Sequence, residues 1–251
     1  MVLTKWDTDE DGQHLNRHYL DGRLSALSFY KLNGWPIYHP RMQFRMADGQ
    51  FDLSHWLVYK DLEFKYATSC EVSREEHSTG RALEAYFTRL WPGMTPSPPG
   101  KLFPVFVHCR NTTTLLNKAT GAKRNEDQCK TALDFLNTMV SITRISARRI
   151  GMLLPYRGNV TLTQRLLDVN LDGEYDALQD MEPVSTVDSY QGQEKDIMCV
   201  VMGTTKQSGP GFTSQENRLN VMLSRQKEVR DPHSTRKPFG DTKATDMTTG
   251  C

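Results

Sequence analysis

The spacing of apolar residues along the first sixty positions predicts two helices and one short strand. Residues 22–33 carry leucine and aromatic side chains at helical intervals, and Gly34 follows as a stop signal. Residues 37–38 form a short apolar pair that we interpret as a strand. Residues 50–60 repeat the helical spacing, with Asp48 as a candidate N-terminal cap.

The pattern weakens over residues 63–101 and sharpens afterwards. Residues 63–101 lack a strong period, which predicts an irregular insertion with a helix over 80–90 and a Pro-rich closing turn. Beyond it, apolar runs alternate with amphipathic stretches, which is typical of an α/β fold with a parallel sheet and helices on both faces. The predicted strands cover residues 102–108, 150–154, 184–187 and 197–202, and the predicted helices cover 125–142, 158–169 and 216–223.

The predicted helix over residues 125–142 has a clear apolar face, and both ends of the chain are polar. Cys129, Leu133, Leu136 and Val140 are spaced so that they lie on one side of that helix. Residues 1–21 predict a polar leader, and residues 227–251 lack an apolar period, which predicts a disordered tail. The folded domain is therefore expected to cover about residues 22–226.

Composition narrows the class of protein without identifying it. The chain has 251 residues, of which 37% are hydrophobic, and its 31 basic residues nearly balance 30 acidic ones. The net charge of +1 argues neither for nor against nucleic-acid binding, because a basic groove can be local. No apolar run approaches the roughly 18 residues of a membrane span, so we expect no membrane partner.

The cysteines and the acidic residues predict no metal site. Five cysteines form no C-x-x-C pair, which disfavours a zinc ribbon or a disulfide framework and fits reduced thiols in the cytoplasm or nucleus. Asp7, Asp9 and Asp11 resemble the start of a calcium loop, but His18 stands where the bidentate glutamate belongs.

Residues 185–196 are the stretch most suggestive of chemistry. A strand leads into a polar loop that contains Gly192, Glu194 and Lys195, and a second strand leaves it. Glycine lets the backbone approach a ligand closely, and ligands bind at the carboxyl ends of strands in open α/β sheets. Taken alone, this stretch is either a ligand-binding loop or an ordinary polar surface loop.

Two arginines of the following helix are candidates for phosphate chemistry. Arg218 and Arg225 lie seven residues apart, about two helical turns, so both could project from one side. A planar guanidinium that is always charged suits a phosphoryl group in its transition state. The alternative is a pair of ordinary surface arginines.

Residues 185–196 and 216–225 closely resemble motifs V and VI of the up-frameshift-like superfamily 1B helicases, a group of RNA and DNA helicases. Residues 43–46, Gln-Phe-Arg-Met, are similar to the Q-(Y/F)-R-M motif of that family, and residues 151–157 are similar to its strand that ends in a Pro-Tyr turn. The resemblance covers roughly residues 20–226 and is weakest over 63–100. It implies a second RecA-like domain of the P-loop NTPase type, preceded by a remnant of the interdomain connection.

The resemblance implies nucleotide-facing roles for six residues. Arg45 and Arg225 would reach across an interdomain cleft to the γ-phosphate as arginine fingers. Gln43 would order the same edge, and Arg218 would also belong to this nucleotide-facing group. Gly192 and Glu194 would lie against the nucleotide, with Glu194 near the sugar.

The resemblance also implies contacts with a nucleic-acid strand. Thr186, Asp188 and Ser189 would sit by the strand backbone or couple the strand to the nucleotide. A second group, Pro155, Tyr156 and Arg157, would contact the strand, although Tyr156 could instead be an ordinary core residue.

The chain lacks the features by which this family holds ATP. It contains neither G-x-x-x-x-G-K-(S/T) nor an acidic pair that follows a buried strand. ATP and Mg²⁺ are therefore expected only in a complete two-domain helicase, in which an N-terminal RecA-like domain is the partner. The chain alone, as a fragment, is expected to hydrolyse ATP negligibly. After Gln226 the family continues into a hydrophobic strand, whereas residues 227–232 are polar, so the sheet is expected to expose an edge.

Three functions remain open at this stage. The first is the C-terminal motor half of an ATP-dependent helicase acting on single-stranded RNA or DNA, and the sequence does not choose between the two nucleic acids. The second is a non-catalytic nucleic-acid-binding or regulatory module derived from a helicase. The third, an unrelated α/β nucleotide-binding protein, is disfavoured because the chain has no Gly-rich phosphate loop.

Overall fold

The computed structural model describes residues 24–117 and 122–227, so the predicted polar leader and nearly all of the predicted tail lie outside the described residues. The chain divides into two compact units, the first ending at Arg41 and the second beginning at Met42. Each unit is described by itself. None of the helices in the described residues has the length and apolar character that a membrane span requires.

Within residues 24–41, the described part of the first unit, there is one short helix. Helix α2 (Ala26–Leu32) begins after Ser25, whose hydroxyl accepts a hydrogen bond from the Ser28 amide at 3.1 Å. The helix predicted over residues 22–33 is thus confirmed, although none of its side chains is buried. The strand predicted over residues 37–38 is wrong, because this segment has no strand partner among the described residues. Pro36, which has no backbone N–H to donate, immediately precedes it.

The core of the second unit is built on helix α5 (Glu126–Thr143). Asn125 caps it by accepting a hydrogen bond from the Gln128 amide at 3.0 Å, and Arg144 ends it in the left-handed region. The apolar face predicted from the sequence is confirmed, because Cys129, Leu133, Leu136 and Val140 are all buried. Helix α6 (Arg157–Val169) packs against α5 and matches the helix predicted over residues 158–169.

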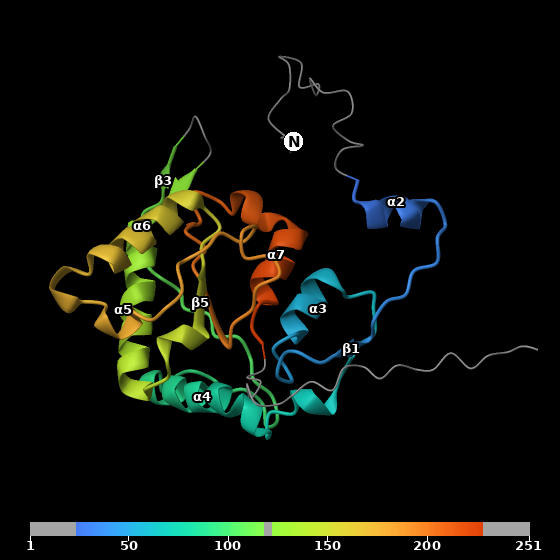
Figure 1. The fold of residues 1–251 in the computed structure, drawn as a ribbon, viewed down its shortest axis with the longest axis horizontal. Helices are drawn as coiled ribbons and strands as arrows, with labels where there is room; N and C mark the ends of the chain where they lie inside the picture. The colour runs from blue at the N-terminus through green and yellow to red at the C-terminus, as the bar shows by residue number, and fades with distance from the viewer. Residues whose placement is uncertain (1–23, 118–121, 228–251) are drawn as a thin grey trace, which may run out of the picture. The chain divides into compact units, whose positions relative to one another are not determined.

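The described sheet around this core is parallel. Strand β5 (Ile150–Leu153) pairs with β6 (Ile197–Val200), with Ile150 opposite Ile197 and Leu153 opposite Val200. The strand predicted over residues 184–187 is reduced to one parallel bridge, between Ser185 and Leu153. In the view of Figure 1, α5 and α7 (Glu216–Leu223) lie on either side of β5, as expected for an α/β fold of the RecA-like type.

The insertion over residues 63–101 contains the expected helix. Helix α4 (Ser78–Leu90) covers the predicted segment 80–90 and starts slightly earlier. The candidate cap Asp48 is wrong: it does not cap the neighbouring helix α3 (Asp52–Val58), and its carboxylate lies 3.8 Å from the Lys101 ammonium. The remaining strands are β1 (Met42–Gln43), parallel to β2 (Lys65–Tyr66), and β3 (Leu115–Leu116), antiparallel to β4 (Lys123–Arg124). Short 3₁₀ turns cover Thr68–Cys70, Glu75–His77, Ala147–Arg149, Leu171–Gly173, Asp176–Leu178 and Gly211–Ser214.

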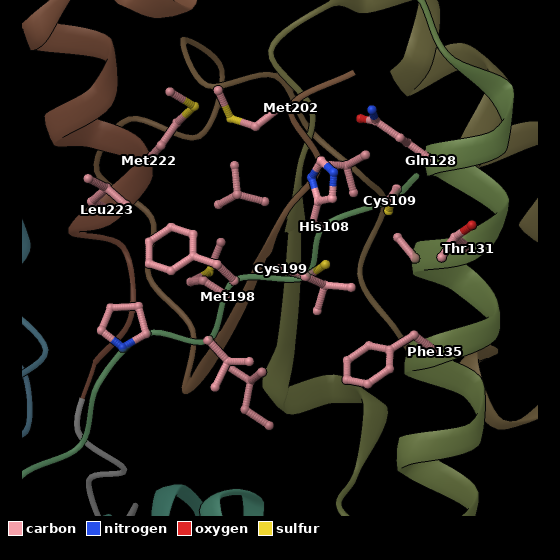
Figure 2. A pocket seen from close by; sticks show the side chains of 18 of the residues that line it. His108, Cys109, Gln128, Thr131, Phe135, Met198, Cys199, Met202, Met222 and Leu223 are labelled. Atoms are coloured by element: carbon pink, nitrogen blue, oxygen red, sulfur yellow. The ribbon is translucent and has the colours of Figure 1, made fainter. Parts of the chain in front are cut away.

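The buried strand predicted over residues 102–108 is wrong. The segment has no ladder partner among the described residues, and Phe106 is 76% exposed. A cavity of about 1320 Å³ lies between this segment, β6, α5 and α7. Figure 2 shows Phe135 of α5 and Met222 of α7 reaching into it from opposite sides. A strand buried on both faces needs neighbours to pair with, and no such neighbour stands beside this segment among the described residues.

Candidate nucleotide-facing site and strand-facing edge

Three separate parts of the sequence converge on Arg45. Strand β1 ends at Gln43, whose side-chain oxygen accepts a hydrogen bond from the Arg45 amide at 2.7 Å. The Arg45 guanidinium lies 3.3 Å from a carboxylate oxygen of Glu194, in the loop before β6. It also donates to the backbone carbonyl of Ser224, just after α7, at 3.3 Å. The sequence segments that hold the predicted residues Gln43, Arg45, Glu194 and Arg225 therefore meet at one place.

Arg225 follows α7 and is held beside this pair by the last residues of that helix and its cap. Its guanidinium donates to the Val221 carbonyl at 3.1 Å and to the Ser224 hydroxyl at 3.1 Å. Burial lowers the pKa of Arg225, and the nearby charge of Arg45 lowers it further, whereas Glu194 acts in the opposite direction. The two guanidinium groups lie close enough to repel each other. A phosphate anion bound between them would offset that repulsion.

A third cation, which the sequence interpretation missed, completes the cluster. The ammonium of Lys227 lies 3.7 Å from a carboxylate oxygen of Glu194. The backbone of Lys195 forms a parallel bridge with Gln226: its carbonyl accepts a hydrogen bond from the Lys227 amide at 2.9 Å, and its amide donates to the Arg225 carbonyl. Alternation along such an extended segment puts Arg225 and Lys227 on one face, a signal that was present in the sequence. Three cations thus surround one carboxylate.

Contacts between α3 and α7 fix the position of this cluster. The Asn220 side-chain amide donates to the Tyr59 hydroxyl at 2.6 Å, and the Ser54 hydroxyl donates to the Leu223 carbonyl at 3.4 Å. The Ser224 hydroxyl in turn donates to the Asn220 carbonyl at 2.6 Å. These bonds hold the end of α7, from which Arg225 emerges. Neither Ser54 nor Tyr59 belongs to a recognisable motif, so no pattern in the sequence pointed to them.

The loop over residues 186–196 runs from one end of the sheet to the other. Ser185 lies opposite Leu153 at the carboxyl end of β5, whereas Ile197 lies opposite Ile150 at its amino end. The loop thus connects the carboxyl edge with the amino edge, next to the arginine cluster. Gly192, within it, is exposed and has open space around it.

Hydrogen bonds and two buried side chains give this loop a fixed shape. The Thr186 hydroxyl accepts from the Ser189 amide at 3.2 Å, and the Ser189 hydroxyl accepts from the Thr186 amide at 3.0 Å. Val187 and Tyr190 are buried beneath it. Burial is the main cause that raises the pKa of Tyr190 to about 12. Thr186, Asp188 and Ser189, which were predicted to contact a nucleic-acid strand, therefore lie together at the carboxyl edge of the sheet.

The expectation that Arg218 and Arg225 project from one side is wrong. Arg218 forms an ion pair with Asp188, with an N–O distance of 3.3 Å, and also donates to the Gln215 side chain. The structure therefore places Arg218 with the carboxyl-edge residues, whereas Arg225 lies in the arginine cluster. Seven residues is close to two full turns of an ideal helix, but Arg225 follows the end of α7, where the helical geometry has stopped.

The prediction that residues 155–157 contact a nucleic-acid strand needs a similar correction. Pro155 and Tyr156 are buried, and the Tyr156 hydroxyl donates to the Pro210 carbonyl at 2.9 Å. The alternative that Tyr156 is a core residue is therefore the one that the structure favours. Arg157, the first residue of α6, is exposed and still available to a strand.

The cluster combines three cations with a single carboxylate, that of Glu194. Among the described residues, no group of three His, Cys, Asp or Glu side chains is placed to bind a metal. Glu194 is the carboxylate at the cluster, and its two oxygens already face Arg45 and Lys227. The cluster of Arg45, Arg225 and Lys227 around Glu194 therefore carries a net positive charge.

Comparison with known proteins identifies the family. A protein-family model described as an AAA domain matches residues 27–229. The chain belongs to the AAA-domain family. Its relatives include a probable helicase of Dictyostelium discoideum, which is 32% identical over 146 residues, and the DNA polymerase alpha-associated DNA helicase A of Saccharomyces cerevisiae, 30% identical over 106 residues. The probable helicase senataxin of Homo sapiens is 36% identical over 85 residues.

These relatives confirm the resemblance to an up-frameshift-like superfamily 1 helicase domain. The alignments cover 56%, 42% and 33% of this chain, respectively. They cover only 14%, 14% and 3% of the relatives themselves. The similarity therefore assigns a domain, and the activity of a whole helicase does not follow from it directly.

Proposed function

We propose that the second unit of this chain is the half of a superfamily 1 helicase motor that supplies arginines to a nucleotide held mainly by another RecA-like domain. The convergence of Arg45, Glu194 and Arg225 from three distant segments is the observation that carries this proposal. Preorganised guanidinium groups stabilise the charge that develops on a transferring phosphoryl group. ATP and Mg²⁺ would be bound chiefly by the partner domain, because this chain has no phosphate loop.

The same proposal assigns strand binding to the carboxyl edge. The exposed Arg157 and the loop residues Thr186 and Ser189 would contact the backbone of single-stranded RNA or DNA. Contacts of this kind are directed at phosphates and sugars, so binding should be sensitive to salt and tolerant of sequence. The loop over residues 186–196 would transmit strand binding to Glu194, because it joins the two edges of the sheet.

The decisive experiment measures ATP turnover and ATP binding by the 251-residue chain, with and without single-stranded oligonucleotides. We expect no measurable turnover, because arginines alone do not orient the attacking water. We expect the wild-type chain to bind ATP weakly. Arg225→Ala should reduce the affinity about tenfold at low salt, because one charged hydrogen bond is lost. The matched control is Arg148→Ala, which removes a 74% exposed arginine that pairs with Asp180.

Two outcomes would oppose the proposal in different ways. Turnover that is stimulated by a strand and lost in Arg225→Ala would show that the chain contains a complete site for ATP. Strand binding together with no ATP binding, in the wild type as in Arg225→Ala, would favour the alternative of a non-catalytic module for nucleic-acid binding.

A further inference from the structure

Lys123 of β4 is a buried lysine that has no acidic partner within the described parts of the chain. It is only 4% exposed, and none of the described carboxylates forms an ion pair with it. Its ammonium donates to the backbone carbonyls of Ser208, at 2.8 Å, and Gly209. It also lies over the ring of Tyr156, 5.6 Å from its centre. Burying a charge without a counter-charge is costly, so these carbonyl contacts must be well formed.

The carbonyls that Lys123 binds belong to a loop that is anchored at several further points. The loop covers residues 203–211 and follows the carboxyl end of β6. The Gln128 side chain accepts from the Gly203 amide at 3.0 Å and donates to the Thr204 carbonyl at 2.8 Å. The Tyr156 hydroxyl holds the Pro210 carbonyl. Its anchors therefore come from β4, α5 and the start of α6.

The anchored loop presents polar side chains at the edge assigned to strand binding. Lys206 and Gln207, at its tip, are exposed. The loop follows the carboxyl end of β6, whereas Arg157 follows that of β5. Loops at the carboxyl ends of parallel strands meet at one edge of a sheet. Fixing the backbone of the loop would set the position of Lys206 relative to Arg157.

We propose that Lys123 is a positioning residue for nucleic-acid binding, which holds the loop over residues 203–211 in the shape that contacts a single strand. Lys123 acts through the carbonyls of Ser208 and Gly209 and does not touch the strand itself, because it is enclosed. This inference rests on the proposed strand binding at the carboxyl edge, and it adds a second loop and a residue outside the recognised motifs.

The test measures the affinity of the 251-residue chain for labelled oligo(U) and oligo(dT) over a series of salt concentrations. Lys123→Met keeps the length of the side chain and removes its charge. We expect about tenfold weaker binding, as for the loss of a charged hydrogen bond, with an unchanged salt slope. The matched control is Lys206→Met at the exposed tip, for which the slope should fall by about one because a phosphate contact is lost.

A second variant and hydrogen exchange separate positioning from unfolding. Tyr156→Phe removes the bond to the Pro210 carbonyl and should also weaken binding without changing the slope. In Lys123→Met the amides of residues 203–211 should exchange faster, while those of α5 stay protected. If Lys123→Met unfolds the chain, Tyr156→Phe decides the question: unchanged affinity in that variant overturns the inference.

The remaining outcomes distinguish this inference from the proposed function. A salt slope that falls by about one in Lys123→Met would mean that Lys123 contacts phosphate, which overturns the positioning role. Wild-type affinity in a folded Lys123→Met variant overturns the inference alone, because strand binding itself is intact. A wild-type chain that binds neither oligonucleotide overturns the strand-binding part of the proposed function, and this inference with it.

Discussion

The Arg45 guanidinium and the Glu194 carboxylate form an ion pair, with an N–O distance of 3.3 Å, between the segment after β1 and the loop before β6. Both side chains are nearly half exposed, at 46% and 40%. A pair this exposed contributes little to stability, because water screens it. Its effect on ligand binding is larger, since Glu194 offsets part of the positive charge that Arg45, Arg225 and Lys227 would offer to an anion.

Glu194→Gln is therefore expected to strengthen the binding of inorganic tripolyphosphate. Removing the carboxylate frees Arg45 and raises the net charge of the cluster by one, so affinity should rise about threefold at low salt and converge on the wild-type value at high salt. Titration calorimetry over a salt series measures this. For ATP the gain should be smaller, because the proposed contact between Glu194 and the sugar is lost at the same time.

Asp180→Asn is the control for this experiment, since it removes an exposed carboxylate that pairs with Arg148. It should leave tripolyphosphate affinity unchanged. Weaker binding of tripolyphosphate by Glu194→Gln would contradict the prediction, and would mean that Glu194 orders the cations instead of neutralising them.

The sequence predicted best where structure depends on local pattern. Helices α5, α6 and α7 and strand β5 lie within a few residues of their predicted bounds, because helical periodicity and a continuous apolar run are properties of neighbouring positions. The same reasoning failed over residues 102–108. An apolar run shows that a segment can be buried, but its pairing depends on which strand stands beside it, and that information lies elsewhere in the chain.

The candidate site was predictable only where motifs defined it. Arg45, Glu194 and Arg225 each lie in a recognisable motif, and the folded chain brings the three together. The direction of Arg218 was not predictable, because its partner Asp188 lies thirty positions earlier and only the folded chain brings them together. Lys123 has no sequence signature at all, since a lysine in a short hairpin is normally exposed.

Gly203→Ala is expected to destabilise the fold much more than Gly209→Ala. Both glycines have a φ close to +63°, so alanine is strained at either position. A Cβ at Gly203 would also overlap the side-chain amide of Asn159. That side chain is buried, and its oxygen accepts a hydrogen bond from the backbone amide of Asn125 at 2.8 Å. A Cβ at Gly209 meets nothing within 4 Å.

We expect a loss of about 3 kcal/mol for Gly203→Ala, from strain and overpacking together, and about 1 kcal/mol for Gly209→Ala, from strain alone. Urea unfolding followed by circular dichroism measures both. Equal losses in the two variants would contradict the close packing of Gly203 on Asn159.

Tyr190→Phe is expected to stabilise the chain at neutral pH. The Tyr190 hydroxyl is buried and has no hydrogen-bond partner among the described residues, which costs free energy. Removing it should raise the free energy of unfolding by about 1 kcal/mol. Tyr38→Phe, at a side chain that is 88% exposed, is the control and should change nothing.

The pH dependence of stability tests the same residue. Burial raises the pKa of Tyr190 to about 12, above the value near 10 of an unfolded tyrosine. The folded chain therefore binds the phenolic proton more tightly than the unfolded chain does. This tighter binding contributes fully to the free energy of unfolding below pH 10, and the contribution is lost as the pH rises to 12. Tyr190→Phe should lose less stability than the wild type between pH 7 and 10.5. An identical loss in both proteins would contradict the burial of this hydroxyl.

The segment over residues 102–108 permits a direct test of sequence against structure by amide hydrogen exchange. In the described residues, the amides of positions 105–108 make no backbone hydrogen bond, whereas β5 is paired along its whole length with β6. Amides without partners exchange quickly, so positions 105–108 should exchange within seconds at neutral pH while β5 stays protected for far longer. Strand β5 serves as the internal reference. Protection of positions 105–108 equal to that of β5 would mean that the strand predicted from the sequence forms in solution, and that it fills the cavity beside β6.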